Sequence, residues 1–467
     1  MELAGKNAVV VGMARSGVAA AELLLRRGAR VVATDRKPAA ELPPQVVSLR
    51  EKGARLELGA HVPATFTAAE LVVVSPGVPW DLPELVSARR AGAEVIAELE
   101  LGFRCLAGTV AAVTGTKGKS TTTAALGAML KQAGRDVRVG GNIGEAVTGL
   151  VEGSTAETLF VLEVSSFQLE GTESFHPRVA VFLNLSADHL DRHPSFEDYA
   201  RAKARIFRNQ TEADWAVVNA DDPAVLALAR EGRARRLHFH LHPDAPPPED
   251  RGPAAFFAAG EARLERGGAT ESLFTLAQVR LPGAHLAGDL LAAAAAARLL
   301  GAPAGEVSAA VGSFTGVEHV LERVADIGGV AFFNDSKATN VDAARKGIEA
   351  FAGPLLVIMG GRYKGGDFHE LAGALAARGK AVLAIGEARE RIAEALGSSL
   401  PVIRCGGLGE AVAKAWAEAK PGDTVLLAPA CSSFDMFEDY AARGRAFKEE
   451  VRRLEPREPA GPTGARR

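Results

Sequence analysis

The segment 114–121, with the sequence TGTKGKST, restricts the possible folds of this 467-residue chain more than any other segment. It follows the apolar run TVAAV and precedes a helix-forming stretch that ends at Gly134. Its glycines allow a tight loop whose backbone N–H groups point inward, and a helix that begins there adds the positive end of its dipole. Lys119 and Ser120 stand where an ammonium group reaches terminal phosphates and a hydroxyl binds Mg²⁺. The segment therefore predicts a strand, a phosphate-binding loop and a helix in succession.

The loop is a shortened form of the G-x-x-x-x-G-K-[ST] pattern, because the first glycine of that pattern would fall at Val113. A plain strand–turn–helix with a glycine turn is the alternative interpretation. We favour phosphate binding because the glycine, the lysine and the serine all stand at the functional offsets.

Short apolar runs alternate with helix-forming stretches along the whole chain, and many of the runs lead into turns that contain Gly, Ser or Asp. This alternation is typical of βαβ units with parallel sheets, so we predict an α/β fold. The predicted strands are residues 7–11, 30–34, 71–74, 110–113, 159–163, 179–183, 215–218, 330–333, 355–359, 381–385 and 424–427. The predicted domains are 1–101, 102–315 with an exposed Pro-rich loop at 242–253, and 316–455, followed by a disordered tail at 456–467.

Composition excludes several classes of protein. Lys and Arg number 54 and Asp and Glu number 57, and the resulting net charge of −3 does not favour a nucleic-acid partner. Cys105, Cys405 and Cys431 show no C-x-x-C spacing, which argues against a disulfide framework or a structural zinc site. No apolar run is long enough for a bilayer, and the N-terminus lacks the layout of a signal peptide. We therefore expect a cytoplasmic protein that is not inserted in a membrane.

The first 35 residues outline a nucleotide-binding βαβ unit. An apolar strand ends at Gly12, a helix starts near Ser16, and Asp35 closes the next strand, where a carboxylate can bind ribose hydroxyls. Position 14 is alanine, so the G-x-G-x-x-G pattern is not met, and a purely structural turn is an equal alternative. A second turn at 75–79, with Gly77, would lie at the same carboxyl edge of the sheet.

Acidic and imidazole side chains follow two strands of the second predicted domain. Glu163 ends one strand, and His189 lies in the polar turn 184–191 that follows the next. Because the same domain carries the phosphate loop, both are candidate magnesium ligands or neighbours of such ligands. Lys203 lies among arginines in a helix-forming stretch, which by itself predicts only a solvated helix face.

Three polar turns follow apolar strands in the last predicted domain, at 334–340, 360–367 and 428–435. Each turn could be only a helix N-cap, but three of them at one sheet edge favour an anionic ligand. The side chains presented at that edge would be Lys337, Thr339, Lys364 and Ser433.

The chain resembles the Mur ligase family over nearly its whole length, from Gly12 to about Phe447. The patterns shared by the whole family are the phosphate loop, the GNIG segment at 141–144 and the segment 184–191. Three further segments resemble specifically the family members that add D-glutamate, namely EVSSFQLE at 163–170, NDSKATN at 334–340 and PACSSF at 429–434.

This resemblance implies a Rossmann-like domain that binds a UDP-linked substrate, a central ATPase domain with a phosphate loop and a parallel sheet, and a C-terminal Rossmann-like domain. It implies an ATP-dependent ligase that joins D-glutamate to UDP-N-acetylmuramoyl-L-alanine through an acyl phosphate, in cytoplasmic peptidoglycan synthesis for the cell wall. Phosphoryl transfer to a carboxylate gathers negative charges that Mg²⁺ and lysine must neutralise, and two Mg²⁺ sites are expected. The expected partners are these three substrates, and the expected state is a monomer.

The resemblance also implies roles for individual residues. ATP would contact Gly115, Thr116, Lys117, Gly118, Lys119, Ser120, Thr121 and Asp335. The UDP-linked substrate would contact Met13, Ala14, Arg15, Asp35, Arg36, Gly77, Asn142, Ser165 and Gln168. D-glutamate would contact Lys337, Thr339, Lys364, Ser433 and Phe434. Ser120 with Glu163, and His189 with a carbamylated Lys203, would hold the two Mg²⁺ ions, and the catalytic residues would be Lys119, His189, Lys203 and Lys337.

Four positions depart from the family pattern. Val320 stands where an arginine that contacts ATP phosphate is expected, and Leu286 and Asp289 stand where two asparagines near adenine are expected. The loss of one charge-assisted contact costs about 1.5–3 kcal/mol, so we expect weaker use of ATP rather than inactivity. Lys117 stands where asparagine is common and adds positive charge.

Three alternatives stay open at the level of sequence. A Mur-type or folylpolyglutamate-type ligase for another amino acid is opposed by the segments 334–340 and 165–169. A catalytically impaired relative that binds the UDP-linked substrate is motivated by Val320 and Leu286 and opposed by the retained phosphate-loop and metal residues. An NAD-dependent oxidoreductase is suggested by the first 35 residues alone and leaves the phosphate loop unexplained.

Overall fold

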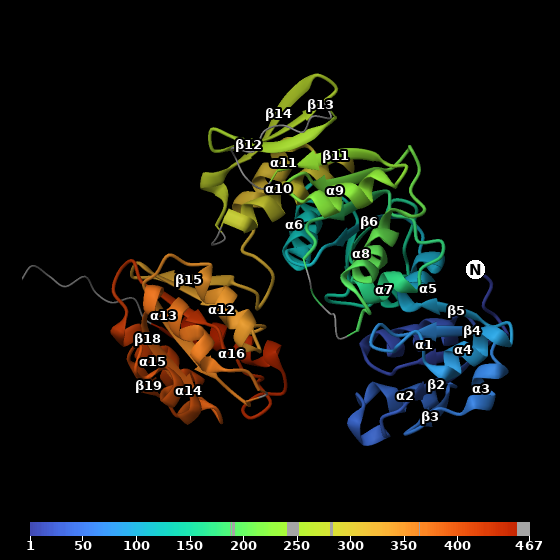
Figure 1. The fold of residues 1–467 in the computed structure, drawn as a ribbon, viewed down its shortest axis with the longest axis horizontal. Coiled ribbons are helices and arrows are strands. Elements are labelled where there is room, and N and C mark those ends of the chain that lie inside the picture. Colours follow the sequence, from blue (N-terminus) through green and yellow to red (C-terminus); the bar gives the residue numbers. More distant parts are fainter. Residues whose placement is uncertain (187, 189–191, 241–251, 281–283, 364, 455–467) are drawn as a thin grey trace, which may run out of the picture. The chain divides into compact units, whose positions relative to one another are not determined.

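The computed structural model describes residues 1–186, 188, 192–240, 252–280, 284–363 and 365–454. Three β-sheets, each flanked by helices, follow one another along the chain (Figure 1). The α/β fold class predicted from the alternation of apolar runs and helix-forming stretches is confirmed.

The first sheet has five parallel strands in the order β3-β2-β1-β4-β5. They are β1 (Asn7–Val11), β2 (Arg30–Asp35), β3 (Arg55–Leu58), β4 (Leu71–Val74) and β5 (Glu94–Ala97). One face packs on α1 (Arg15–Arg26) and α2 (Gln45–Glu51), the other on α3 (Pro63–Thr67) and α4 (Pro83–Arg90), and α5 (Glu98–Cys105) follows β5. The strand order reverses between β1 and β4, so the loops after these two strands diverge and leave a crevice at the carboxyl edge.

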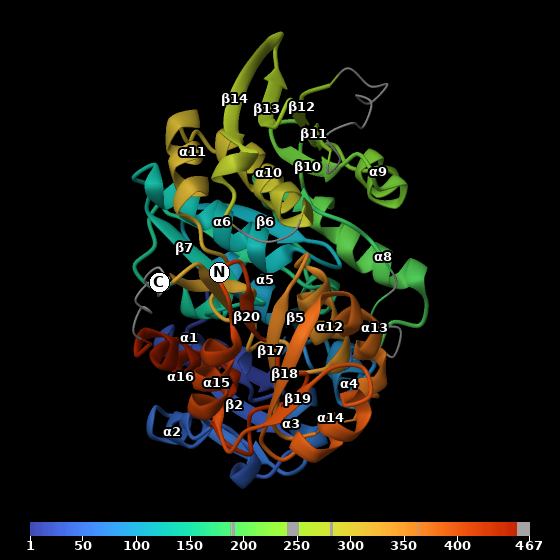
Figure 2. The same ribbon diagram turned by 90° about the vertical axis from the view of Figure 1, so that its left-hand side faces the viewer.

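The second sheet has nine strands in the order β14-β13-β12-β11-β10-β9-β6-β8-β7. Its parallel part consists of β6 (Thr109–Thr114), β7 (Val137–Gly141), β8 (Leu159–Glu163), β9 (Val179–Phe182), β10 (Trp215–Asn219) and β11 (Arg235–Phe239). Beyond β11, the strand β12 (Ala254–Ala258) pairs in parallel with β11 and starts an antiparallel extension with β13 (Glu261–Arg266) and β14 (Ala269–Thr275), visible as a projecting ribbon in Figure 2. The helices are α6 (Lys119–Gln132), α7 (Ser166–Glu170), α8 (Phe196–Ala204), α9 (Pro223–Arg230), α10 (Ala284–Leu299) and α11 (Ala304–Ser313).

The third sheet has six strands in the order β15-β16-β20-β17-β18-β19, and only the edge strand β15 is antiparallel. They are β15 (Glu322–Ile327), β16 (Val330–Asn334), β17 (Leu355–Gly360), β18 (Gly379–Ile385), β19 (Val402–Arg404) and β20 (Thr424–Leu427). The helices are α12 (Val341–Glu349), α13 (Ala372–Arg378), α14 (Arg389–Leu396), α15 (Leu408–Glu418) and α16 (Tyr440–Arg452). Separate hydrophobic clusters cover its two faces, which explains why its central strands are apolar throughout.

Two compact units emerge from the contacts within the chain. One consists of Met1–Val279 and Ala287–Ser313 and holds the first two sheets, and the other consists of Arg280–Leu286 and Phe314–Arg467 and holds the third. The domain limits at 101/102 and 315/316 stay predictions, and the predicted loop at 242–253 and tail at 456–467 lie largely or wholly outside the described residues. Within the described part, no helix combines the length and the apolar character needed to cross a membrane.

Candidate functional site

The phosphate loop connects β6 to α6 in the predicted way. Gly118 precedes the first turn of α6 with a φ of 80°, and Gly115 has a φ of 151°, both in the left-handed region that favours glycine. The ammonium group of Lys119 donates hydrogen bonds to the carbonyl oxygens of Gly115, at 3.0 Å, and Thr116, at 2.9 Å. The loop thus curls around the ammonium group of the lysine at the start of α6.

Asn184, which follows β9, holds this loop from the neighbouring strand. Its Oδ1 accepts the N–H groups of Thr116, at 3.1 Å, and Lys117, at 2.8 Å, and its Nδ2 donates to the carbonyl of Lys117 at 3.1 Å. The segment 184–191 carries part of the family resemblance, but the sequence does not predict Asn184 itself as a functional residue. Its position after a strand that neighbours β6 is the signal that could have identified it.

Glu163 links the phosphate loop to the next part of the site. Its side chain is buried, and its two carboxylate oxygens accept hydrogen bonds from the Ser120 hydroxyl and the Asn142 amide, each at 2.7 Å. Glu163 and Asn142 follow the neighbouring strands β8 and β7, so parallel strand pairing brings both to the edge at which α6 begins. The predicted proximity of Ser120 and Glu163 is found in the structure.

Lys203 is buried, so the solvated helix face expected from its neighbours in the sequence is wrong. Its ammonium group donates to the carbonyl of Gly115 at 2.8 Å and lies 4.8 Å from the centre of the Tyr199 ring. Burial, together with the charge of Lys119, lowers the pKa of Lys203 to about 7, and the charges of Asp188 and Glu163 act in the opposite direction. The sequence pattern fails here because the face of α8 that carries Lys203 packs under the phosphate loop.

The described residues supply part of the predicted metal sites. Ser120 and Glu163 offer a hydroxyl and a carboxylate side by side, whereas His189 lies outside the described residues. Among the side chains that the structure describes, no three His, Cys, Asp or Glu residues form a cluster that could hold a metal ion. Any ion bound at Ser120 and Glu163 would therefore need oxygen ligands from substrate or water.

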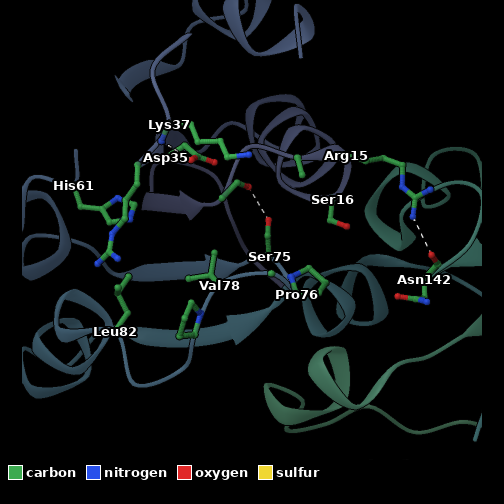
Figure 3. A pocket seen from close by; sticks show the side chains of 15 residues that line it. Arg15, Ser16, Asp35, Lys37, His61, Ser75, Pro76, Val78, Leu82 and Asn142 are labelled. Carbon is green, nitrogen blue, oxygen red and sulfur yellow. Dashed lines mark hydrogen bonds between the residues drawn. The ribbon is translucent and has the colours of Figure 1, made fainter. Parts of the chain in front are cut away.

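A cavity of about 570 Å³ lies at the carboxyl edge of the first sheet (Figure 3). Six of the nine residues expected to contact the UDP-linked substrate line it, namely Ala14, Arg15, Asp35, Arg36, Gly77 and Asn142. Ser75, Pro76 and Val78 also line it and belong to the turn 75–79, which the sequence predicts at this edge, whereas Lys37, His61 and Leu82 were not predicted. These residues belong to turns after β2, β3 and β4, so the topology of the sheet, rather than a motif, identifies them.

Asp35 shapes this cavity through the backbone. Its carboxylate oxygens accept the N–H groups of Met13, at 2.7 Å, and Lys37, at 2.9 Å, which ties the loop after β1 to the loop after β2. The side chain of Met13 is buried in the core, so only its backbone is available to a ligand. His61 accepts or donates a hydrogen bond at 2.9 Å with the Thr34 hydroxyl and lies at the same end of the cavity as Asp35 and Lys37 (Figure 3).

Arg15 and Asn142 connect the cavity to the phosphate loop. The guanidinium group of Arg15 donates to the carbonyl oxygen of Asn142 at 3.1 Å, at the end of the cavity opposite His61 (Figure 3). The side-chain amide of Asn142 donates to Glu163, and Glu163 accepts from Ser120. Asn142 and Glu163 therefore link Arg15 to the start of α6. The lining residue Asn142 is therefore linked through Glu163 to Ser120 of the phosphate loop.

Ser165 and Gln168 pair with each other at the start of α7. The Ser165 hydroxyl accepts the N–H of Gln168 at 3.3 Å, and Gln168 Oε1 accepts the N–H of Ser165 at 3.0 Å, which forms a capping box. Neither residue lines the cavity of the first sheet. Their role in substrate binding stays a prediction.

Of the described residues predicted to bind D-glutamate, Lys337 and Thr339 follow β16, and Ser433 and Phe434 follow β20. Lys337 is exposed, Ser433 is buried, and the Phe434 ring is 56% exposed, while Lys364 lies outside the described residues. Asp335, assigned to ATP by the resemblance, is buried, and its carboxylate accepts the N–H of Leu321 at 3.2 Å. Burial raises the pKa of Asp335 to about 7.

The positions that depart from the family pattern have distinct surroundings. Val320 is half-buried in a turn where His319 and Leu321 both have positive φ values, 66° and 42°. Leu286 and Asp289 are buried on α10. The Asp289 carboxylate lies so close to the phosphate loop that a Cβ added at Gly118 would be 2.3 Å from its Oδ1, and burial raises the pKa of Asp289 to about 7.

Comparisons with known proteins agree with this architecture. Residues 6–97 match the family description "Mur ligase MurD-like, N-terminal domain", residues 113–297 match "Mur ligase middle domain", and residues 321–431 match "Mur ligase, glutamate ligase domain". Each match covers most of one sheet and its helices.

Relatives of similar length extend the match to the whole chain. The chain is 49% identical to a UDP-N-acetylmuramoylalanine–D-glutamate ligase of Acidobacterium capsulatum over 97% of both chains. It is 44% identical to the ligase of the same name in Solibacter usitatus, over 98% of this chain and all of that one. The solved UDP-N-acetylmuramate-alanine ligase of Thermotoga maritima shares the fold, with a TM-score of 0.58 and 21% identity over 95% of this chain and 99% of that one.

Three α/β domains with a phosphate loop at the first strand of the central sheet define the class of this protein, a nucleotide-dependent ligase. Within that class, the chain belongs to the Mur ligase family.

Proposed function

We propose that this protein joins D-glutamate to UDP-N-acetylmuramoyl-L-alanine in an ATP-dependent reaction, as one step of peptidoglycan precursor synthesis. The relatives with this printed name, 49% and 44% identical over nearly the full chain, support the choice of substrates. The cytoplasm as the site of this reaction, and a monomer as the active form, belong to the same proposal.

The observation that carries the proposal is the position of Glu163. One carboxylate oxygen binds Ser120 of the phosphate loop, and the other binds Asn142 at the end of the cavity in the first sheet. A substrate whose nucleotide lies in that cavity would therefore extend its free carboxylate toward the terminal phosphate of ATP. An oriented pair of reactants gains much of its rate from this placement alone.

The proposed chemistry proceeds in two steps. A carboxylate oxygen of the L-alanyl group attacks the γ-phosphorus, the bond to the bridging oxygen of ADP breaks, and an acyl phosphate forms. The amine of D-glutamate then attacks the carbonyl carbon, loses a proton, and inorganic phosphate leaves as the amide bond forms. Lys119 holds the transferred phosphoryl group against the loop N–H groups and offsets its negative charge.

Ser120 and Glu163 fit a magnesium ion, because Mg²⁺ in nucleotide sites is bound by one or two protein oxygens together with phosphate oxygens and water. When bound, Mg²⁺ would neutralise charge on the phosphate oxygens. His189 and Lys203 would hold the second ion. A neutral lysine amine reacts with CO₂ to give a carbamate, an anionic oxygen ligand, and the lowered pKa of Lys203, about 7, favours the neutral amine.

The amino-acid site is proposed at the carboxyl edge of the third sheet. Lys337 is an exposed cation that would pair with a carboxylate of D-glutamate, and Thr339 and Ser433 would supply hydroxyl groups. Lys364 and Phe434 complete the proposed set.

Phosphate release tests this function directly. Purified protein is incubated with ATP, Mg²⁺ and UDP-N-acetylmuramoyl-L-alanine, and D-glutamate, L-glutamate or no amino acid is added in parallel. Release that depends on D-glutamate, with a product heavier by one glutamyl residue, is expected. Release with another amino acid would instead favour a ligase of different specificity, and tight binding of the UDP-linked substrate without any release would favour the catalytically impaired relative.

A further inference from the structure

Arg443, on α16, is fully buried, although a guanidinium group is charged and carries five N–H donors. Such a side chain is stable in a protein interior only where hydrogen-bond acceptors replace the lost water. Arg443 satisfies this need with backbone carbonyls and one hydroxyl rather than with a carboxylate ion pair.

The guanidinium group contacts three separate segments of the second unit. Its Nε donates to the Ser336 hydroxyl at 2.9 Å, and Nη2 donates to the Ser336 carbonyl at 2.8 Å. Its Nη1 donates to the carbonyl of Cys431 at 3.1 Å and, more weakly, to that of Gly360 at 3.5 Å. These acceptors lie after, or at the end of, β16, β20 and β17, which are adjacent strands of the third sheet.

Two of these segments, those after β16 and β20, also carry described residues that are proposed to bind D-glutamate. Ser336 immediately precedes Lys337, and Cys431 lies two residues before Ser433. Gly360 ends β17 and begins the polar turn 360–367. One buried side chain therefore holds all three segments in fixed positions relative to one another.

Backbone contacts close the segments around the guanidinium group. The N–H of Arg362 donates to the carbonyl of Ser432 at 2.9 Å, and the N–H of Ser432 donates back at 3.2 Å. Gly361, which lies between Gly360 and Arg362 in the chain, has a φ of 134°. A Cβ there would lie 2.2 Å from the Ser432 carbonyl oxygen and 3.2 Å from Arg443 Nη1. Only glycine lets the turn approach Arg443 this closely.

The charge of Arg443 persists in this enclosed position. Burial lowers its pKa to about 10, so the group stays protonated at neutral pH, with Cys431 and Asp435 acting in the opposite direction. A buried positive charge behind loops that present further cations attracts anionic ligands from the solvent side.

We propose that Arg443 is a positioning residue for the amino-acid substrate, because it fixes the three loops at the carboxyl edge of the third sheet and places a positive charge behind them. The inference rests on the proposed function for the identity of that substrate. Arg443 itself does not touch the substrate, so it is distinct from the proposed binding residues.

The test compares Arg443→Lys with Arg445→Lys, a matched change at an exposed position of the same helix. Lysine keeps the charge, but its single nitrogen cannot bridge three loops with the planar geometry of a guanidinium group. We expect the KM for D-glutamate to rise at least tenfold in Arg443→Lys, equivalent to about 1.4 kcal/mol. The KM values for ATP and the UDP-linked substrate should stay within about twofold, and Arg445→Lys should match the wild type.

A role confined to folding would produce other results. Unchanged KM for D-glutamate, equal changes in all three KM values, or a fall in kcat alone would overturn the inference. If Arg443→Lys does not fold, Ser336→Ala decides the question, because it removes one acceptor and keeps the guanidinium group. A rise in the KM for D-glutamate of about three- to tenfold would support the inference, and no selective rise would refute it.

Failure of the proposed function gives a different outcome. A wild-type protein that releases phosphate only with another amino acid would reject D-glutamate as the substrate. The same comparison, made with the KM for that other amino acid, would then still test whether Arg443 positions the loops.

Discussion

Lys203 has the properties of a modifiable amine because of what packs against it. It is buried, it donates to the Gly115 carbonyl, and the charge of Lys119 adds to burial in lowering its pKa to about 7. The fraction of neutral amine therefore rises as the pH increases through about 7, and with it the capacity to form a carbamate. A residue on the exposed face of α8 would have neither property.

We predict that isotopically labelled bicarbonate gives a carbamate signal on Lys203 that increases from about pH 6 to about pH 8. Lys203→Met should remove the signal and lower phosphate release by at least about tenfold. As a control, Lys203→Met combined with Arg201→Lys, which places a lysine at an exposed position of α8, should not restore the signal. Equal labelling of Lys203→Met and wild type would contradict the prediction.

Asp289 makes the stability of the folded protein depend on pH, because its pKa is raised, whereas that of Lys203 is lowered. Burial raises the pKa of its carboxyl group to about 7, so the folded state binds the proton more tightly than the unfolded state, whose pKa is about 4. The resulting stabilisation is fully present below about pH 4 and is lost as the pH rises through about 7. Asparagine has a similar size and does not titrate.

We predict that Asp289→Asn gains stability relative to the wild type between about pH 5 and about pH 8, by on the order of 2–4 kcal/mol. The free energy of unfolding in urea at the two pH values measures this gain. Asp335, which is also buried with a raised pKa, titrates in both proteins and cancels in the comparison. Glu197→Gln, at an exposed position, should show the same difference from wild type at both pH values.

The helix α5 shows how one element joins two sheets within the first unit. Glu100, buried on this helix, accepts the backbone N–H groups of Glu173, at 3.0 Å, Ser174, at 2.8 Å, and Phe175, at 3.0 Å. These three residues precede β9 of the second sheet, whereas α5 follows β5 of the first. The carboxylate therefore satisfies three donors that would otherwise lose their partner.

We predict that Glu100→Ala lowers the free energy of unfolding by about 3 kcal/mol or more, because buried N–H groups without an acceptor keep their full desolvation cost. Urea unfolding followed by circular dichroism measures the change. Arg104 forms ion pairs with both Glu100 and the exposed Glu173. Glu173→Gln removes only the exposed pair and should change the free energy by less than about 1 kcal/mol. A similar loss in both variants would exclude this role for Glu100.

The difference between central strands and edge strands explains which strands the sequence predicts. All eleven predicted strands are present with ends within two residues, because central parallel strands such as β4 and β17 are buried on both faces and are apolar throughout. Short or charged strands were missed, among them β3 with the sequence RLEL and the antiparallel extension from β12 to β14. Their partners, rather than their composition, make them strands.

Over the whole molecule, the described surface gives little basis for a stable homo-oligomer. The large apolar side chains exposed among the described residues are Met1, Val47, Val62, Leu276, Phe434 and Tyr440. Apart from Phe434 and Tyr440, they are far apart in the sequence, whereas permanent interfaces bury continuous apolar surface.

We predict that the protein is a monomer of 48.6 kDa in solution at micromolar concentration. Light scattering coupled to size-exclusion chromatography measures the mass, with and without ATP and Mg²⁺ as a control for association induced by ligands. A mass of twice this value that persists on dilution would refute the prediction.

The sequence by itself determined the α/β class, the phosphate loop and the family, because glycine spacing, apolar runs and the identity of Lys119 and Ser120 are local properties of the chain. Only the tertiary structure decided that Lys203 and Asp289 lie against the phosphate loop, and that Arg443 holds three loops together. Burial, pKa and hydrogen-bond partners depend on residues distant in the sequence, and the same lysine or arginine on an unpaired helix would be solvated.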